Sequence, residues 1–263
     1  MNLVKGGITA PKGFLANGVA AGIKRSGKLD LGLVVSTVPA KTAGVFTINS
    51  IKAAPLLVSM KHIRKGTSCA ILANSGNANC YTGAIGLKHA QDSAGLFAKL
   101  LDIKKKDVLV TSTGIIGKTL PYAKIVHAAP ALVKGLSDKG GVKFARAIMT
   151  TDLALKEIAV QVNLSGKTVA IGACAKGSGM VAPNMATMLG FITTDAAISL
   201  PLLNLALKNA VDHSFNSITV DGCMSTNDMV TIQASGLAGN KAIVKEGADF
   251  KKFYQALDRK SVV

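Results

Sequence analysis

The sequence predicts an α/β (α+β) protein in which helices and mixed strands pack in layers. Short apolar segments bounded by turn residues alternate with segments of helical periodicity, and no repeat or low-complexity tract interrupts them. Hydrophobic residues make up 49% and charged residues 17% of the 263 residues, which is typical of a globular protein with a sizeable core. The order of the strands does not follow from this pattern.

Six short apolar segments are predicted to be strands because turn residues bound them. They are Leu29–Val35, Ala43–Ile48, Cys69–Ala73 and Val108–Thr111 in the first part of the chain and Ile218–Val220 and Met229–Gln233 later. Between these groups, the dipeptide Ser165-Gly166 separates the apolar segments 157–164 and 167–174. This pattern predicts a β-hairpin that leads into a glycine-rich loop.

Three segments have the periodicity of helices. In Gly86–Leu101, a single apolar stripe is formed by Leu87, Ala90, Ala94, Phe97, Ala98 and Leu101. The same spacing over Leu203–Val211 predicts a second helix, which follows Pro201, a residue that favours the first turn. A last helix is predicted at Ala248–Leu257.

The formal net charge of +17 raises the question of nucleic-acid binding. The basic residues are scattered, however, and the chain has only eight Phe, three Tyr and no Trp that could stack on bases. We therefore predict no nucleic-acid partner. Attraction of an anionic small substrate is the better explanation of the charge.

No apolar run is long enough for a spanning helix, and the glycine- and lysine-containing start of the chain predicts no signal peptide. The four cysteines, Cys69, Cys80, Cys174 and Cys223, have no paired short spacing. Neither a metal site nor a disulfide framework is therefore predicted. These features favour a protein of the reducing cytoplasm without a membrane partner.

The segment Ala173–Ala196 has the composition expected around a self-activating nucleophile. Gly177 and Gly179 allow unusual backbone angles, and Ala186 leaves the carbonyl before Thr187 with little steric cover. The Thr187 hydroxyl could attack that carbonyl and divide the chain. The new α-amine of Thr187 would then serve as the base for an N-terminal threonine nucleophile. The alternative is an ordinary loop followed by a core strand.

The segment Val108–Thr119 is a predicted strand that runs into a glycine turn. It nearly matches a phosphate-binding loop, because Gly117, Lys118 and Thr119 fit, but Ser112 replaces the first glycine. A second interpretation makes Thr113 and Gly114 an oxyanion hole. The plainest one is a structural turn between a strand and a helix.

The segment Asn74–Gly83, rich in asparagine and glycine, has the composition of a tight turn after an apolar strand. Cys80 within it could be nucleophilic, but no histidine lies nearby in the sequence. We therefore expect a structural turn with an inert thiol.

In combination, eight motifs resemble one family over nearly the whole chain. They are GGITAPKGF, AGVFTIN, NSGNAN with TG, STGIIG, AIMTTD, AKGSGMVAPNMATMLGFITTDA, SFNSITVDG and STND, in this order. The sequence is similar to the ornithine acetyltransferases, the bifunctional glutamate N-acetyltransferases of arginine biosynthesis. The resemblance implies a layered sandwich of helices and mixed sheets, shared with aminopeptidases of the same superfamily.

The resemblance also implies roles for particular residues. Thr187 matches the nucleophile, self-cleavage falls between Ala186 and Thr187, and Thr113 with Gly114 match the oxyanion pair. The chain would thus consist of an α-chain region, residues 1–186, and a β-chain region, residues 187–263.

Two further positions match substrate-binding residues of the family. Thr150 and Lys176 are the matches, with Thr151 as the alternative to Thr150. Thr187 would contact substrate as well.

The implied reaction moves an acetyl group from N2-acetylornithine to glutamate through an acetyl-threonine. The implied assembly has two α and two β chains, without a metal or organic cofactor. Acetyl-CoA is a co-substrate that the resemblance leaves open.

One departure from the family concerns the second chain, which is usually about as long as the first. Here it spans only residues 187–263, and the end LDRKSVV leaves the family pattern. We therefore expect a truncated C-terminal part and little exchange activity from the chain as given. The alternative functions are an N-terminal-threonine aminopeptidase or amidohydrolase, and an inactive truncated remnant.

Overall fold

The computed structural model describes residues 1–178, 188–214, 216 and 225–258. In this part of the chain, one mixed sheet contains the strands β1 (Asn2–Val4), β2 (Phe14–Val19), β3 (Leu31–Phe46), β4 (Thr67–Asn77), β5 (Val108–Ile115), β6 (Lys156–Leu164), β7 (Lys167–Lys176), β8 (Leu189–Thr194) and β9 (Met229–Ala234). The helices are α1 (Ala54–His62), α2 (Gly83–Leu100), α3 (Tyr122–Lys134), α4 (Gly141–Ile148), α5 (Leu200–Asp212) and α6 (Ala248–Asp258). Single 3₁₀ turns are η1 (Gly7–Thr9), η2 (Ile63–Lys65) and η3 (Lys105–Asp107).

The strands follow the spatial order β1-β6-β7-β8-β9-β3-β4-β5, and β2 pairs with β3 outside this path. The pairs β4/β5 and β8/β9 are parallel, whereas the other pairs are antiparallel. The long strand β3 connects the two parts of the sheet. Its first half pairs with β2 and β4 and its second half with β9, with a register shift between Val35 and Ala40.

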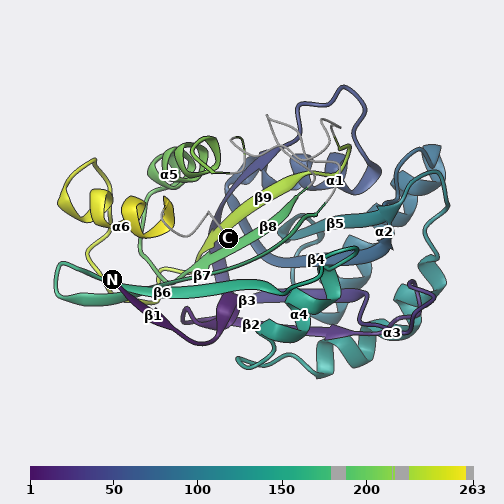
Figure 1. The fold of residues 1–263 in the computed structure, drawn as a ribbon, viewed down its shortest axis with the longest axis horizontal. Coiled ribbons are helices and arrows are strands. Elements are labelled where there is room, and N and C mark those ends of the chain that lie inside the picture. Colours follow the sequence, from purple (N-terminus) through teal and green to yellow (C-terminus); the bar gives the residue numbers. More distant parts are fainter. Residues whose placement is uncertain (179–187, 215, 217–224, 259–263) are drawn as a thin grey trace.

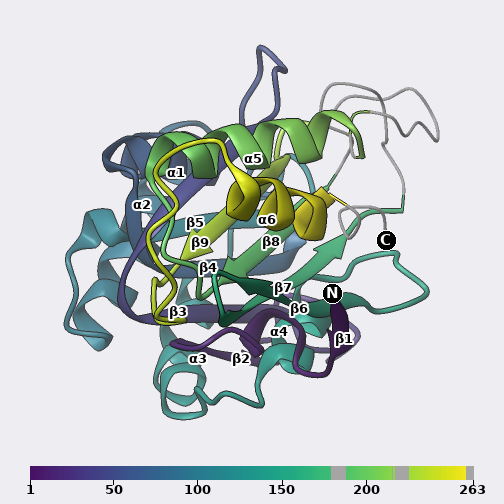
Figure 2. The same cartoon turned by 90° about the vertical axis from the view of Figure 1, so that its left-hand side faces the viewer.

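Helices cover both faces of the sheet. Figures 1 and 2 show α5 and α6 on one side of the strands and α3 and α4 on the other, with α1 and α2 beside β4 and β5. Under α5 and α6 lies an apolar core that includes Leu203, Leu207 and Phe253, while Phe97 of α2 packs on β4 and β5 in a second core. Burial of such side chains, each worth about 1.5–3 kcal/mol, holds the layers together.

A third core lies where α4 crosses β2 and β3. Phe144 of α4 meets Phe191 of β8 edge to face, with ring centroids 5.2 Å apart. Gly18 of β2 allows α4 to pack closely on that strand, because a Cβ atom at this position would lie 2.2 Å from the carbonyl oxygen of Lys143. The small residues of β2 are therefore a packing requirement and obscure its strand pattern.

The layered α/β arrangement predicted from the sequence is confirmed, with one difference in the strands. The predicted strands Leu29–Val35 and Ala43–Ile48 belong to a single strand, β3, which stays paired on both sides of its register shift. The polar residues and the proline between the two segments suggested a break in the sequence pattern. The predicted strand Ile218–Val220 lies outside the described residues.

The predicted hairpin is confirmed. Strands β6 and β7 pair from Lys156 and Ala175 to Leu164 and Lys167, and Ser165 and Gly166 both have positive φ, 48° and 80°, as a tight hairpin turn requires. Among the described helices, none combines the length and the apolar character needed to cross a bilayer.

Candidate active site

A pocket of about 1150 Å³ gathers the site residues that the sequence predicts and the structure describes. Its lining includes Thr113, Gly114, Thr150, Thr151 and Lys176. They come from the end of β5, the loop after α4 and the end of β7. Because β4 and β5 are parallel, their carboxyl ends meet at this edge of the sheet.

The predicted nucleophile and cleavage site, Thr187 and Ala186, lie outside the described residues. Their roles stay predictions. The next residue, Met188, is described, and its N–H donates to Oδ1 of Asp228 at 3.0 Å. Asp228 thus holds the chain one residue after Thr187.

Gly114 lies where the backbones of β4 and β5 approach unusually closely. Its φ is +130°, and a Cβ atom would lie 2.5 Å from the carbonyl carbon of Gly76 and 2.6 Å from the amide nitrogen of Asn77. Only glycine fits this position. Its backbone is also exposed on the pocket side, where a ligand can reach it.

Lys176 fixes the hydrogen-bonding role of Thr113. Its Nζ donates to Thr113 Oγ1 at 3.0 Å, and both residues are buried. Because an ammonium group can only donate, the threonine oxygen is the acceptor and its own hydrogen remains available for another partner. That arrangement suits a donor to a developing oxyanion.

The charge of Lys176 is set by opposing effects. Burial lowers the pKa of its ammonium, while the carboxylates of Asp152 and Asp228 favour the charged form. The pKa of Lys176 is lowered overall, and the two nearby acidic residues that oppose this shift were not singled out by sequence analysis.

Asp152 connects two walls of the pocket. Its Oδ1 accepts from Gly177 N and Lys156 Nζ, both at 2.8 Å, and its Oδ2 accepts from Thr150 N at 3.1 Å. Burial would raise the pKa of this carboxyl, but the hydrogen bonds from these donors outweigh burial and lower it. Thr150 and Gly177, the residue after Lys176, are thereby held by a single anchor.

The environment of Asp228 raises the pKa of its carboxyl, whereas that of Asp152 lowers it. Asp228 is 1% exposed, and burial raises its pKa to about 7 against the opposing effects of Met188 N–H, the Ser225 hydroxyl and Lys176. The single hydrogen of the Thr47 hydroxyl is donated to the carbonyl oxygen of Ser225 at 3.0 Å, so it is not donated to Asp228. Among the described residues, Asp228 Oδ2 has no hydrogen-bond partner.

The asparagine-rich segment is a structural support, but the expected turn is wrong for its first part, because β4 continues through Asn74 to Asn77. Asn77 donates to the carbonyl oxygens of Lys118 and Thr119 at 3.1 and 3.2 Å. Asn227 donates to the carbonyl oxygen of Ser112 at 2.8 Å, which ties the STND motif to β5. Cys80 is buried, in keeping with an inert thiol.

Strand β5 continues through Ser112 to Ile115, and α3 begins only at Tyr122. This segment therefore does not form the strand, phosphate loop and helix of a nucleotide-binding motif.

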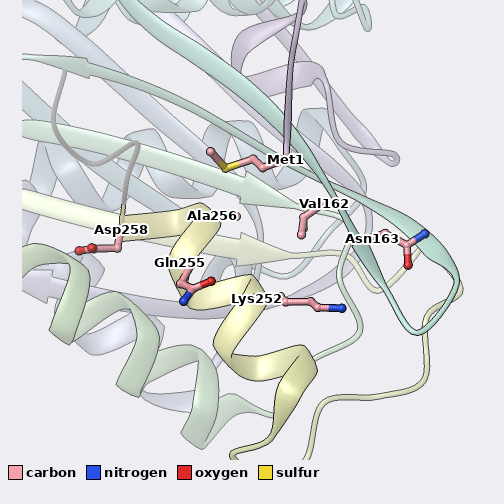
Figure 3. Close-up of a pocket in the computed structure, with 7 residues that line it drawn as sticks. All are labelled: Met1, Val162, Asn163, Lys252, Gln255, Ala256 and Asp258. Atoms are coloured by element: carbon pink, nitrogen blue, oxygen red, sulfur yellow. The ribbon is translucent and has the colours of Figure 1, made fainter.

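A second pocket, of about 710 Å³, lies between β6 and α6 (Figure 3). Strand β6 is next to the edge strand β1, whereas β5 forms the opposite edge of the sheet. It is lined by Met1, Val162, Asn163, Lys252, Gln255, Ala256 and Asp258. None of the predicted site residues contributes to it. The first pocket is therefore the candidate active site.

The fold is shared with solved proteins of the Ntn hydrolase fold. The L-aminopeptidase D-Ala-esterase/amidase of Ochrobactrum anthropi, described as a variant of the Ntn hydrolase fold, aligns with a TM-score of 0.56 over 97% of this chain and 84% of that chain. At 10% identity, this likeness concerns the fold alone.

The sequence comparisons define a family that is narrower than this fold. A sequence profile of the ArgJ family matches residues 15–262, and the chain belongs to that family. The arginine biosynthesis bifunctional protein ArgJ of Caldanaerobacter subterraneus subsp. tengcongensis is 47% identical over 258 residues. These are 98% of this chain and 64% of that protein, so the chain spans just under two thirds of this relative.

A solved ornithine acetyltransferase from Mycobacterium tuberculosis, in complex with ornithine, is 40% identical to this chain. It aligns with a TM-score of 0.65 over 72% of this chain and 99% of the solved chain.

Proposed function

We propose that the protein moves the acetyl group of N2-acetylornithine to glutamate. The reaction has two steps, and N-acetylglutamate forms in the second. The observation that carries the proposal is the buried pair of Lys176 and Thr113 beside the exposed backbone of Gly114, in a chain of the ArgJ family. The ornithine complex of the Mycobacterium tuberculosis relative supports the choice of substrate.

In this proposal Thr187 is the nucleophile. Its Oγ attacks the acetyl carbonyl, and its α-amine takes the hydroxyl proton. The Thr113 hydroxyl and the Gly114 N–H stabilise the oxyanion. The tetrahedral centre then expels the amine of ornithine, which takes up that proton, and an acetyl ester on Thr187 remains.

The second half of the reaction reverses these steps with glutamate. Its neutral amine attacks the ester carbonyl, the Thr187 oxygen leaves with a proton from the attacking nitrogen, and N-acetylglutamate is released. The nucleophile, base and oxyanion donors are all side-chain or backbone groups, so we propose no metal or organic cofactor. Acetyl-CoA as an alternative donor is left to experiment.

The proposal includes the maturation of the protein. Self-cleavage between Ala186 and Thr187 would give an α and a β chain that assemble as two of each, in the cytoplasm. The free, buried thiols of Cys69, Cys80 and Cys174 fit a reducing compartment. We propose neither a nucleic-acid nor a membrane partner.

The test has two parts. For the chain extended to the full length of its relatives, intact-mass measurement should find two chains cut before Thr187, and one uncut chain in Thr187→Ala. Acetyl transfer should then be assayed with this chain and with the same chain extended by the C-terminal part of a curated relative. Normal cutting of Thr187→Ala would refute the assignment of the nucleophile.

A hydrolase is the second candidate, because the fold is shared with an aminopeptidase and amidase. Release of the acetyl group distinguishes the two functions. A transferase releases ornithine in proportion to added glutamate, whereas a hydrolase releases acetate without it.

A further inference from the structure

The wall of the active-site pocket is strongly cationic. Among its described lining residues there is no carboxylate, and the cations are Lys24, Arg25, Lys118, Lys124 and Lys176. A pocket of this kind attracts anions and repels ammonium groups.

Three of these cations already have partners. Lys24 Nζ donates to the carbonyl oxygen of Leu29 at 2.8 Å, Lys124 donates to that of Gly22, and Lys176 donates to Thr113. The head groups of Arg25 and Lys118 have no recorded hydrogen bond or ion pair among the described residues, and both residues are exposed. They are the cations free to bind a ligand.

Hydrogen bonds to Asp30 fix the backbone near Arg25. Asp30 is fully buried, and its carboxylate accepts from Ala21 N at 2.6 Å and from Lys24 N at 2.8 Å. Together with the bonds from Lys24 and Lys124, these contacts hold the loop that precedes β3 against the pocket. A loop held in this way loses little entropy when a ligand binds.

The backbone of Lys118 is fixed in a comparable way. Its carbonyl oxygen accepts from Nδ2 of the buried Asn77, which also donates to the carbonyl oxygen of Thr119. Lys118 lies four positions after Gly114 and lines the same pocket.

We infer that Arg25 and Lys118 form the subsite for the side-chain carboxylate of the acyl-accepting amino acid. This inference rests on the proposed function and adds the origin of acceptor choice. The two amino acids of the reaction differ at the end of the side chain, which is a carboxylate in glutamate and an ammonium in ornithine. A bidentate guanidinium and a nearby ammonium favour the first and disfavour the second.

The first experiment measures binding without turnover. The chain is titrated with L-glutamate, L-glutamine and inorganic phosphate, and amide chemical shifts are followed by NMR. Arg25→Ala and Lys118→Ala should each weaken glutamate binding about tenfold, the loss expected for one charge-assisted hydrogen bond, and leave glutamine binding unchanged. No glutamate binding by the wild type, an equal loss for glutamine, or a site selective for phosphate would overturn the inference.

A charge reversal separates a local contact from the general field. Lys118→Glu should strongly reduce the preference for glutamate over ornithine, whereas the matched control Lys139→Glu should not, because Lys139 is exposed but does not line the pocket. Equal effects of the two variants would show that net charge alone is responsible.

The second experiment uses the extended chain described under the proposed function. Arg25→Ala should raise the KM for glutamate about tenfold and should not raise the KM for N2-acetylornithine, whose side-chain ammonium the guanidinium disfavours. Acetyl transfer with an unchanged glutamate KM would refute the subsite and keep the function. Selective glutamate binding without any acetyl transfer would refute the function and keep the subsite.

Discussion

The ammonium of Lys176 occupies an acceptor position of Thr113 and so directs the threonine hydrogen elsewhere. This contact separates two roles for the lysine. A residue that binds a substrate carboxylate changes KM, whereas a residue that orients the oxyanion donor changes kcat. The 3.0 Å bond favours the second role.

We therefore predict that Thr113→Ala in an active, extended form of the chain lowers kcat about 10²–10³-fold with little change in KM. Thr113→Ser should keep most of the activity because it keeps the hydroxyl. Lys176→Met should also lower kcat, and the double variant should be little worse than the poorer single variant. Steady-state kinetics of the four variants check this, and additive effects would contradict a shared role.

Asp228 predicts a pH dependence of stability. The folded state keeps the proton of this carboxyl up to about pH 7, whereas the unfolded chain loses it near pH 4. The folded state therefore binds more protons in this window, and the contribution of Asp228 to stability falls as the pH rises through it. At most, the change is about 4 kcal/mol.

The measurement is urea unfolding of the wild type and Asp228→Asn at several pH values. Relative to the wild type, the variant should gain stability as the pH rises from about 4 to about 7. A constant difference over this range would show that Asp228 ionises as in an unfolded chain.

At the scale of elements, the closest contact in the site is the one between β4 and β5 at Gly114. We predict that Gly114→Ala costs about 1–3 kcal/mol more than Gly117→Ala, because both glycines have positive φ but only the first would place its Cβ against backbone atoms. Gly117 has no atom within 4 Å of that position. Urea unfolding of both variants checks this, and equal losses would contradict it.

The elements that sequence analysis identified are those whose pattern is set by one apolar face. The stripe over 86–101 predicts α2, and a turn dipeptide predicts the hairpin of β6 and β7. Helix α3 was missed because Pro130 lies inside it, and α4 because it is only eight residues long. Both helices nevertheless have an apolar face, so the local pattern was present but was interrupted in α3 and short in α4.

The candidate site was predictable only in part. Thr113, Gly114, Thr150 and Lys176 were found through family motifs, and their meeting in one pocket depends on strand order, which periodicity does not encode. Asp152 and Asp228 were missed because a carboxylate that anchors backbone N–H groups has no signature in the sequence. Short polar motifs such as TTD and STND were the available signal.

At the scale of the whole molecule, the predicted cut would fall between two strands that pair with each other. Strand β8, which follows the cut, lies between β7 and β9, and β9 pairs with β3. The second region thus supplies interior strands of the sheet. Asn227, from the same region, also binds Ser112 of β5.

We predict that residues 1–186 and 187–263 stay together after cleavage. Size-exclusion chromatography under native conditions should give one species, and only a denaturing gel should separate the two polypeptides. Coexpression of the two segments as separate genes should give the same species. Separate elution under native conditions would contradict the pairing seen across β7 and β8.

The interior position of β8 has a consequence for the order of events during biosynthesis. If the proposed cut before Thr187 requires the completed sheet, it would occur only after β8 has paired with β7 and β9. Maturation would then act as a proofreading step. Molecules that fold incorrectly would keep their nucleophile blocked within the chain, and the proportion of cut protein would report the yield of correct folding.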